Sequence, residues 1–242
     1  MRLVRACTSK RAASIIWDCG NGSWGVWGAL SDTSGRERWV RIGNPEIYLS
    51  PPLRVGEIAV QAPIELHPAL LPGWELAERV RASLLEAIRP VTAAQWAFRP
   101  EAGAWCIAGV VEHLLFAEIG SSKMVRKLIR GDYRAREVPV GATLYTGDLD
   151  RYPYGRLEAP HDLTPGPVRD RAALERELEV AHVRFRAELS RFRGDDPEAL
   201  RSPDAATGDW FTLGGWVKLQ AWHEAHHITQ IHRIVAAPGF PR

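Results

Sequence analysis

The chain has 242 residues, of which 45% are hydrophobic and 25% are charged, and its formal net charge is +2. This balance is typical of a globular protein with one substantial domain, or with one domain and an appendage. Acidic and basic residues are interspersed, so charge gives no reason to expect a nucleic-acid or anionic-membrane partner.

Cysteine usage and hydropathy bear on the cellular compartment. The three cysteines, Cys7, Cys19 and Cys106, are an odd number and form no C-x-x-C motif. A disulfide framework or an all-cysteine zinc site is therefore not expected, and a reducing cytoplasm fits. There is no run of about 18 apolar residues, so we expect no membrane span. The basic start of the chain lacks the continuous apolar stretch of a secretory signal.

Residues 1–66 differ in composition from the rest of the chain. They mix glycine, serine, proline and arginine with isolated tryptophans, and they sustain no period of 2 or 3.6 residues. Short strand-like pieces occur at 39–42 and 57–60. We therefore expect an irregular or disordered N-terminal extension, or an artefact of the gene model in which the true protein starts further along the chain.

Residues 67–238 contain four segments with helical periodicity. Apolar residues recur every three or four positions in segments at about 74–88, 107–129, 169–192 and 213–235. Pro90 ends the first segment, and Gly131 and Gly194 end the next two. Thr212 is a plausible N-cap for the fourth segment. The sequence therefore predicts an all-α four-helix bundle, a fold that places metal sites on facing helices.

A long connection separates the second and third predicted helices. Residues 131–168 contain too many prolines and glycines for regular helix, so we expect an ordered loop that crosses the bundle. Loops of this length are often functional, for instance as the cover of an active site. Its aromatic residues Tyr145, Tyr152 and Tyr154 would either line the mouth of a pocket or simply pack the loop onto the bundle.

Two histidines in the last predicted helix are suited to metal binding. His223 and His227 are four residues apart, so they fall on one face of a helix. Imidazoles at this spacing can bind one metal ion, as in other helical H-x-x-x-H sites. The best candidate for a third ligand is His113, which lies in an apolar part of the second helix. The alternative is that these are ordinary helix histidines, partly exposed or hydrogen-bonded in the core.

Several neighbours of this pair have less specific roles. His226 is rotated by about 100° from His227, so we expect it to pack rather than to bind metal. Gln230 is a candidate to contact a ligand histidine or a substrate, or else a surface glutamine. Glu112 and Glu224 would orient an imidazole, act as acid or base, or be solvated. His67, His161 and His182 read as ordinary loop or surface histidines.

Two groups of motifs carry a family resemblance. Residues 84–88, 96–100, 103–108 and 111–114 resemble the first half of a DinB-like (DinB/YfiT-like) domain, and residues 215–216 and 223–231 are similar to its final helix. The similarity covers about residues 65–235. One difference concerns Cys106, which stands where the family usually has a serine or threonine that caps the second helix. We therefore expect a cap that is weaker by up to about 1 kcal/mol.

The resemblance implies a four-helix bundle, often a homodimer, with a divalent metal held by His113, His223 and His227. The metal in this family is commonly zinc or nickel, and characterised relatives are mostly S-transferases or isomerases that use a low-molecular-weight thiol. It thus implies a metal-dependent thiol S-transferase that acts on a small electrophile. A thiolate held at the open position of the metal would be directed at that electrophile. The alternatives are a hydrolase with a metal-bound water, or a non-catalytic binding or stress-response module.

Overall fold

The computed structural model describes residues 14–18, 23–31, 37–43, 65–132, 137–155 and 157–242. Contacts between Cα atoms divide the chain into two compact units, Met1–Gln61 and Ala62–Arg242. None of the helices in these described ranges combines the length and the hydropathy that crossing a bilayer requires.

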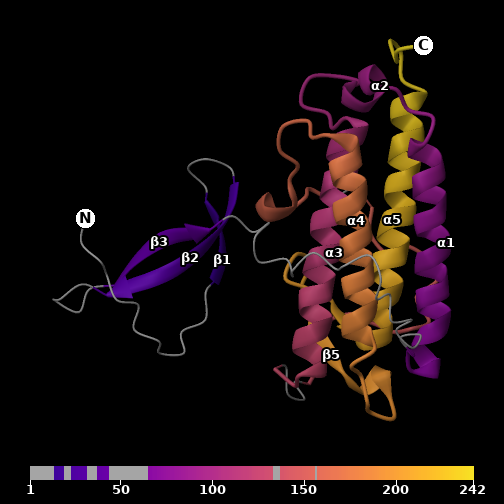
Figure 1. Cartoon of the computed structure of the whole chain (residues 1–242). Coiled ribbons are helices and arrows are strands. Elements are labelled where there is room, and N and C mark those ends of the chain that lie inside the picture. The colour runs from indigo at the N-terminus through magenta and orange to yellow at the C-terminus, as the bar shows by residue number, and fades with distance from the viewer. Residues whose placement is uncertain (1–13, 19–22, 32–36, 44–64, 133–136, 156) are drawn as a thin grey trace, which may run out of the picture. The chain divides into compact units, whose positions relative to one another are not determined.

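The first unit contains a three-stranded antiparallel sheet in the order β1-β2-β3 (Figure 1). Its strands are β1 (Ser14–Asp18), β2 (Ser23–Ser31) and β3 (Glu37–Gly43), with a register shift in β2 between Val26 and Trp27. The strand predicted at 39–42 falls within β3. The sequence did not predict β1 and β2, because glycine and serine interrupt the alternation in this region. The strand predicted at 57–60 lies outside the described residues.

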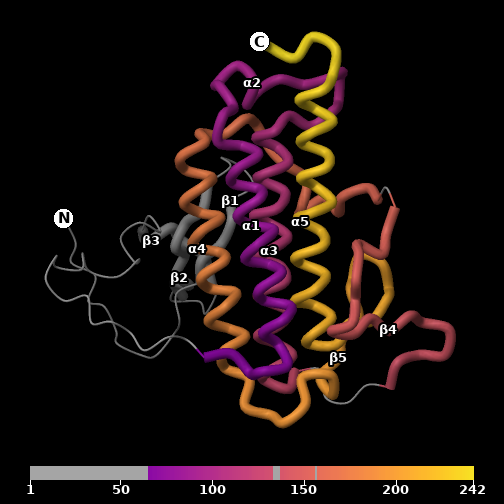
Figure 2. Tube along the Cα trace, turned by 90° about the vertical axis from the view of Figure 1, so that its right-hand side faces the viewer, coloured from indigo at the N-terminus to yellow at the C-terminus, as the bar shows by residue number. Residues whose placement is uncertain are grey.

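The second unit is a four-helix bundle, as the sequence predicted. Its long helices lie side by side in both views (Figures 1 and 2), and they are α1 (Leu71–Ile88), α3 (Ile107–Ile129), α4 (Arg171–Leu189) and α5 (Leu213–Val235). The shorter α2 (Ala93–Ala97) begins at a capping box formed by Thr92 and Gln95. Helix α1 packs mainly on α5, and α3 packs on both α4 and α5.

A buried polar layer separates two apolar clusters along the bundle. One cluster includes Leu84, Ile107, Leu114, Leu174 and Ile231, and the other includes Trp74, Val125, Phe185, Leu213 and Trp216. Between them on the four helices lie buried polar side chains, namely Arg81, Glu118, Ser121, His182, Gln220 and Glu224. The core therefore changes from apolar to polar and back along the helix axes.

The crossover connection is attached to the bundle by a small sheet that the sequence did not predict. Strand β6 (Trp210–Thr212) pairs in parallel with β4 (Leu144–Tyr145) and antiparallel with β5 (Arg201–Pro203). The loop backbone runs so close to α5 that a Cβ atom on Gly215 would lie 2.4 Å from the carbonyl oxygen of Tyr145. Only glycine fits there. The long loop is thus packed against the first turn of α5.

The helix N-termini confirm two predictions from the sequence. Thr212 caps α5, and its hydroxyl accepts a hydrogen bond from the backbone N–H of Gly215 at 2.9 Å. Cys106 is the N-cap of α3 and makes no side-chain hydrogen bond there. Because a thiol is a poor acceptor, the first turn of α3 lacks the side-chain cap that α5 has.

We expect Cys106→Ser to raise the free energy of unfolding by about 0.5–1 kcal/mol, because a hydroxyl can accept a hydrogen bond from the first turn of α3. Urea denaturation of the native protein and the variant measures the difference. The matched control is Cys106→Ala, which removes the thiol without adding an acceptor. Equal stabilities of the serine and alanine variants would contradict this account of the cap.

Candidate metal centre

Three histidines from two helices converge inside the bundle. His113 comes from α3, whereas His223 and His227 come from α5. The Nε2 atom of His223 lies 3.2 Å from Nε2 of His113 and 3.0 Å from Nε2 of His227. One ligand atom from each residue lies within 4.8 Å of the others, and no other group of this kind occurs in the part of the chain that the structure describes. The arrangement brings together the three side chains proposed from the sequence.

Hydrogen bonds fix the tautomers of two of these rings. Nδ1 of His113 lies 2.8 Å from the carbonyl oxygen of Leu163, and Nδ1 of His227 lies 2.7 Å from Oε1 of Gln230. Both oxygens can only accept, so each Nδ1 carries the hydrogen. Each Nε2 then presents a lone pair toward the centre of the group. Hydrogen bonds of this type are the usual means of orienting metal-binding histidines.

The converging lone pairs fit a bound cation. His223 can donate a hydrogen from Nε2 to one neighbour at most, so at least one close pair of nitrogens in this buried site has no hydrogen between them. Nitrogens bound tetrahedrally to one ion at about 2.0–2.1 Å lie roughly 3.3–3.4 Å from each other. The observed separations are close to this value. Three neutral imidazoles therefore fit a divalent ion and leave a fourth position for another ligand.

Burial keeps all three imidazoles in the neutral form that binds metal. Burial lowers the pKa of His113, although the hydrogen bond to Leu163 acts in the opposite direction. Burial and the nearby His113 lower the pKa of His227 to about 3. Burial, followed by the proximity of His227 and His113, lowers the pKa of His223 well below its ordinary value. No proton must therefore leave before a metal binds at neutral pH.

Aromatic rings flank the histidines on two sides. The ring of Trp105 lies 4.9 Å from that of His113, and the ring of Tyr152 lies 5.5 Å from that of His223, centroid to centroid. Burial raises the pKa of Tyr152 to about 12, so its phenol stays protonated.

Of the three loop tyrosines, Tyr152 contacts the site. Tyr145 stacks on Phe211, and Tyr154 donates a hydrogen bond to Asp209 at 3.0 Å, so these two pack the loop.

The glutamates beside the ligands have other partners. Glu112 accepts a hydrogen bond from the backbone N–H of Gly166 at 2.8 Å and pairs with Arg169 at 3.5 Å. It thereby anchors the end of the crossover loop, close to the Leu163 carbonyl that orients His113. Glu224 pairs with Arg81 at 2.8 Å. Both glutamates are buried, so the expectation of solvated side chains is wrong for them.

The other histidines have different environments. His226 is half-buried with its ring 4.8 Å from that of Tyr152, and it is outside the ligand group. His67 accepts a weak hydrogen bond from Ala69, and His161 is exposed. The expectation for His182 was wrong, because this side chain is buried and its Nδ1 lies 2.7 Å from Oε1 of Glu118. His182 lies four residues after Leu178 and three before Phe185, so helical periodicity places it on the buried face of α4, but the sequence does not identify Glu118 as its partner.

We expect the metal-free protein to lose stability as the pH falls below about 6.5. Histidines in the unfolded chain bind protons near pH 6.5, whereas the pKa of His227 in the fold is about 3. Between these values the unfolded state holds more protons, so acid favours unfolding. Urea denaturation at several pH values measures the slope, to which one such histidine contributes up to about 1.4 kcal/mol per pH unit. His227→Gln should show a shallower slope, and equal slopes would contradict the assignment.

The chain is similar to two proteins of known structure and to one protein family. TT2238, a four-helix bundle protein, has a TM-score of 0.47 and 18% identity, over 68% of this chain and 98% of that one. The second structure is YfiT from Bacillus subtilis, which is described as a probable metal-dependent hydrolase with an unusual four-helix bundle topology. Its TM-score is 0.48 and its sequence identity is 20%, and the match covers 71% of this chain and 89% of YfiT. No curated protein matches. The model of the DinB superfamily matches residues 76–231, more than half of the chain, and the chain therefore belongs to the DinB superfamily.

Proposed function

We propose that this protein is a metal-dependent enzyme in which His113, His223 and His227 bind a divalent ion and a small thiol is transferred to an electrophilic substrate. The observation that carries the proposal is the convergence of three Nε2 atoms, two of them with tautomers fixed by hydrogen bonds to Leu163 and Gln230. Three protein ligands leave a position for a reactant, as in catalytic rather than structural sites. Imidazole donors suit zinc and nickel.

The bound ion would supply the positive charge that favours the thiolate form of a thiol and holds its sulfur beside the substrate. The protein's own residues would shape the surroundings. Trp105 lies against the ring of His113 and Tyr152 against the ring of His223, and both would limit the access of water. Sulfur would form a bond to the electrophilic carbon while the leaving group departs with its electron pair. No nucleophilic side chain is needed for this reaction.

The positions of the two neighbouring glutamates favour thiol transfer over hydrolysis. Attack by water is usually assisted by a general base, such as the glutamate of H-E-x-x-H enzymes. Here Glu112 is engaged with Gly166 and Arg169, and Glu224 with Arg81. A thiol ionised by the charge of the ion needs no such base. Hydrolysis, which is described as probable for YfiT, is the second candidate for this chain.

We expect His223→Ala to abolish metal binding and activity together. Elemental analysis should find about one zinc or nickel ion per native chain and almost none in the variant. A panel of bacillithiol, mycothiol and glutathione with small electrophiles, followed by mass spectrometry of thioether products, measures turnover. His226→Ala is the matched control and should retain the metal. A native protein that lacks metal would refute the proposal, and bound metal without turnover would point to a non-catalytic module.

We expect Gln230→Leu to weaken metal binding by about 10–100-fold, because His227 loses the acceptor that fixes its tautomer. Competition with a chelator of known affinity measures the dissociation constant. Gln230→Glu keeps an acceptor oxygen at this position and should retain most of the affinity. If the leucine and glutamate variants bound metal equally well, the orienting role of Gln230 would be refuted.

A further inference from the structure

We infer that Arg81, on the helix α1 that supplies no ligand, positions the metal centre by fixing α3 against α5. The inference rests on the proposed function, because it concerns the same three histidines. His113 must reach His223 and His227 from a different helix, so the geometry of the centre depends on how α3 and α5 are placed relative to each other.

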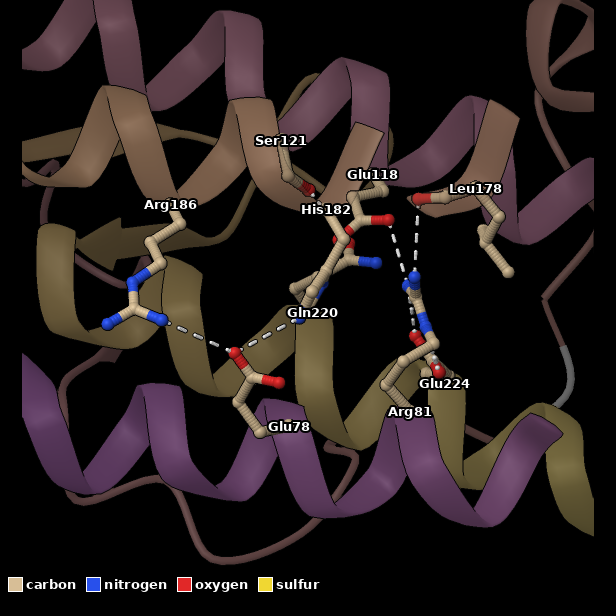
Figure 3. Close-up of polar contacts among 9 residues, drawn as sticks. All are labelled: Glu78, Arg81, Glu118, Ser121, Leu178, His182, Arg186, Gln220 and Glu224. Atoms are coloured by element: carbon tan, nitrogen blue, oxygen red, sulfur yellow. Dashed lines mark hydrogen bonds and ion pairs between the residues drawn. The ribbon is translucent and has the colours of Figure 1, made fainter. Parts of the chain in front are cut away.

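Arg81 is a partner shared by these two helices (Figure 3). Its Nε and Nη2 atoms donate to Oε1 and Oε2 of Glu224 on α5, both at 2.8 Å. Nη2 also donates to Oε2 of Glu118 on α3 at 2.8 Å. A planar guanidinium that binds two carboxylates in this way fixes their separation and orientation.

The fourth helix joins the same network. Nη1 of Arg81 donates to the backbone carbonyl of Leu178 at 3.3 Å, and Glu118 binds Nδ1 of His182 through its other oxygen at 2.7 Å. Figure 3 shows these contacts meeting between the helices. All four long helices are thus connected through one arginine and its partners.

The network is buried, and its exposed fractions are 4% for Arg81, 0% for Glu118 and 3% for Glu224. Although burial opposes ionisation, Glu224 and Glu118 raise the pKa of Arg81 above its ordinary value. Removing three charged groups from water costs several kcal/mol for each ion, so a buried ion network often adds little net stability compared with apolar residues. Such a network can instead select one arrangement of the helices, because the shared guanidinium fixes how the carboxylates of α3 and α5 lie relative to each other.

The carboxylates lie close along their helices to the ligands. Glu224 directly follows His223 on α5, and Glu118 is five residues beyond His113 on α3, which is about 7.5 Å along the axis. Bonds of about 2.0–2.1 Å tolerate little variation in the distances between ligand nitrogens, and sites of this kind need their groups held within about 0.5 Å. A small shift of α3 against α5 would therefore weaken metal binding without unfolding the bundle.

The test uses two variants that change the network in different ways. Arg81→Lys keeps the charge but loses the planar fork. The triple variant R81M/E118Q/E224M removes all three charges, while the amide that replaces the Glu118 carboxylate keeps an acceptor oxygen for His182. Both variants should remain folded by circular dichroism, and both should bind zinc about 10–100-fold more weakly than the native protein. The control is R191K in the exposed Arg191–Glu188 pair, which should bind zinc as tightly as the native protein.

A network that serves only stability predicts something different. The triple variant would then keep the native affinity for zinc whenever it keeps the native melting temperature, and that result would overturn the inference. If the triple variant does not fold, the zinc affinity of Arg81→Lys decides the question. An affinity equal to that of the native protein and of R191K would overturn the inference.

Crystal structures of the metal-free native protein and of Arg81→Lys separate this inference from the proposed function. The Nε2 separations of 3.2 Å and 3.0 Å around His223 should be kept in the native protein, and the separation between His113 and His223 should increase in the variant. Unchanged separations in the variant would overturn the positioning role. A native protein that takes up no zinc or nickel would refute the proposed function alone, because the comparison of the two structures needs no metal.

Discussion

Three imidazole Nε2 atoms that converge inside the bundle are the constraint on which the rest of this structure depends. Burial and mutual proximity lower the pKa values of His223 and His227, so the rings stay neutral. At least one close pair of nitrogens then has no hydrogen between them, and the lone pairs of that pair repel each other. A divalent cation would turn this repulsion into three bonds. A metal ion bound among the three histidines would therefore account for the short distances between their Nε2 atoms.

The crossover loop is a structural part of this centre. The carbonyl of Leu163 fixes the tautomer of His113, Glu112 anchors the nearby end of the loop through Gly166, and Tyr152 covers His223. The β4-β6-β5 sheet and the close approach of the loop to Gly215 attach its other part to α5. Order in the loop and orientation of the three histidines are therefore linked, since each depends on contacts with the same helices.

Membership of the DinB superfamily fits the bundle and its histidine cluster, while the environment of the neighbouring carboxylates bears on the choice of reaction. Glu112 and Glu224 lie next to ligands in the sequence, but each is turned toward a cationic side chain or a backbone N–H. Their charges serve the packing of the loop and the helices. The chemistry we propose accordingly depends on the metal and on a small thiol rather than on an acidic side chain.

Helical periodicity in the sequence determined the four long helices and their approximate ends, because an amphipathic segment must bury its apolar side whatever its partners are. The spacing of His223 and His227 determined that they share a face, and the apolar surroundings of His113 in the second helix made it the candidate third ligand, to which the family resemblance also pointed. The sequence could not show which helix faces which, so the buried Arg81–Glu118–Glu224 network and the environment of His182 followed only from the tertiary structure. The same holds for the Leu163 carbonyl and for the small β4-β6-β5 sheet. These features join residues far apart in the chain through backbone groups and single polar contacts, which leave no periodic pattern in a sequence.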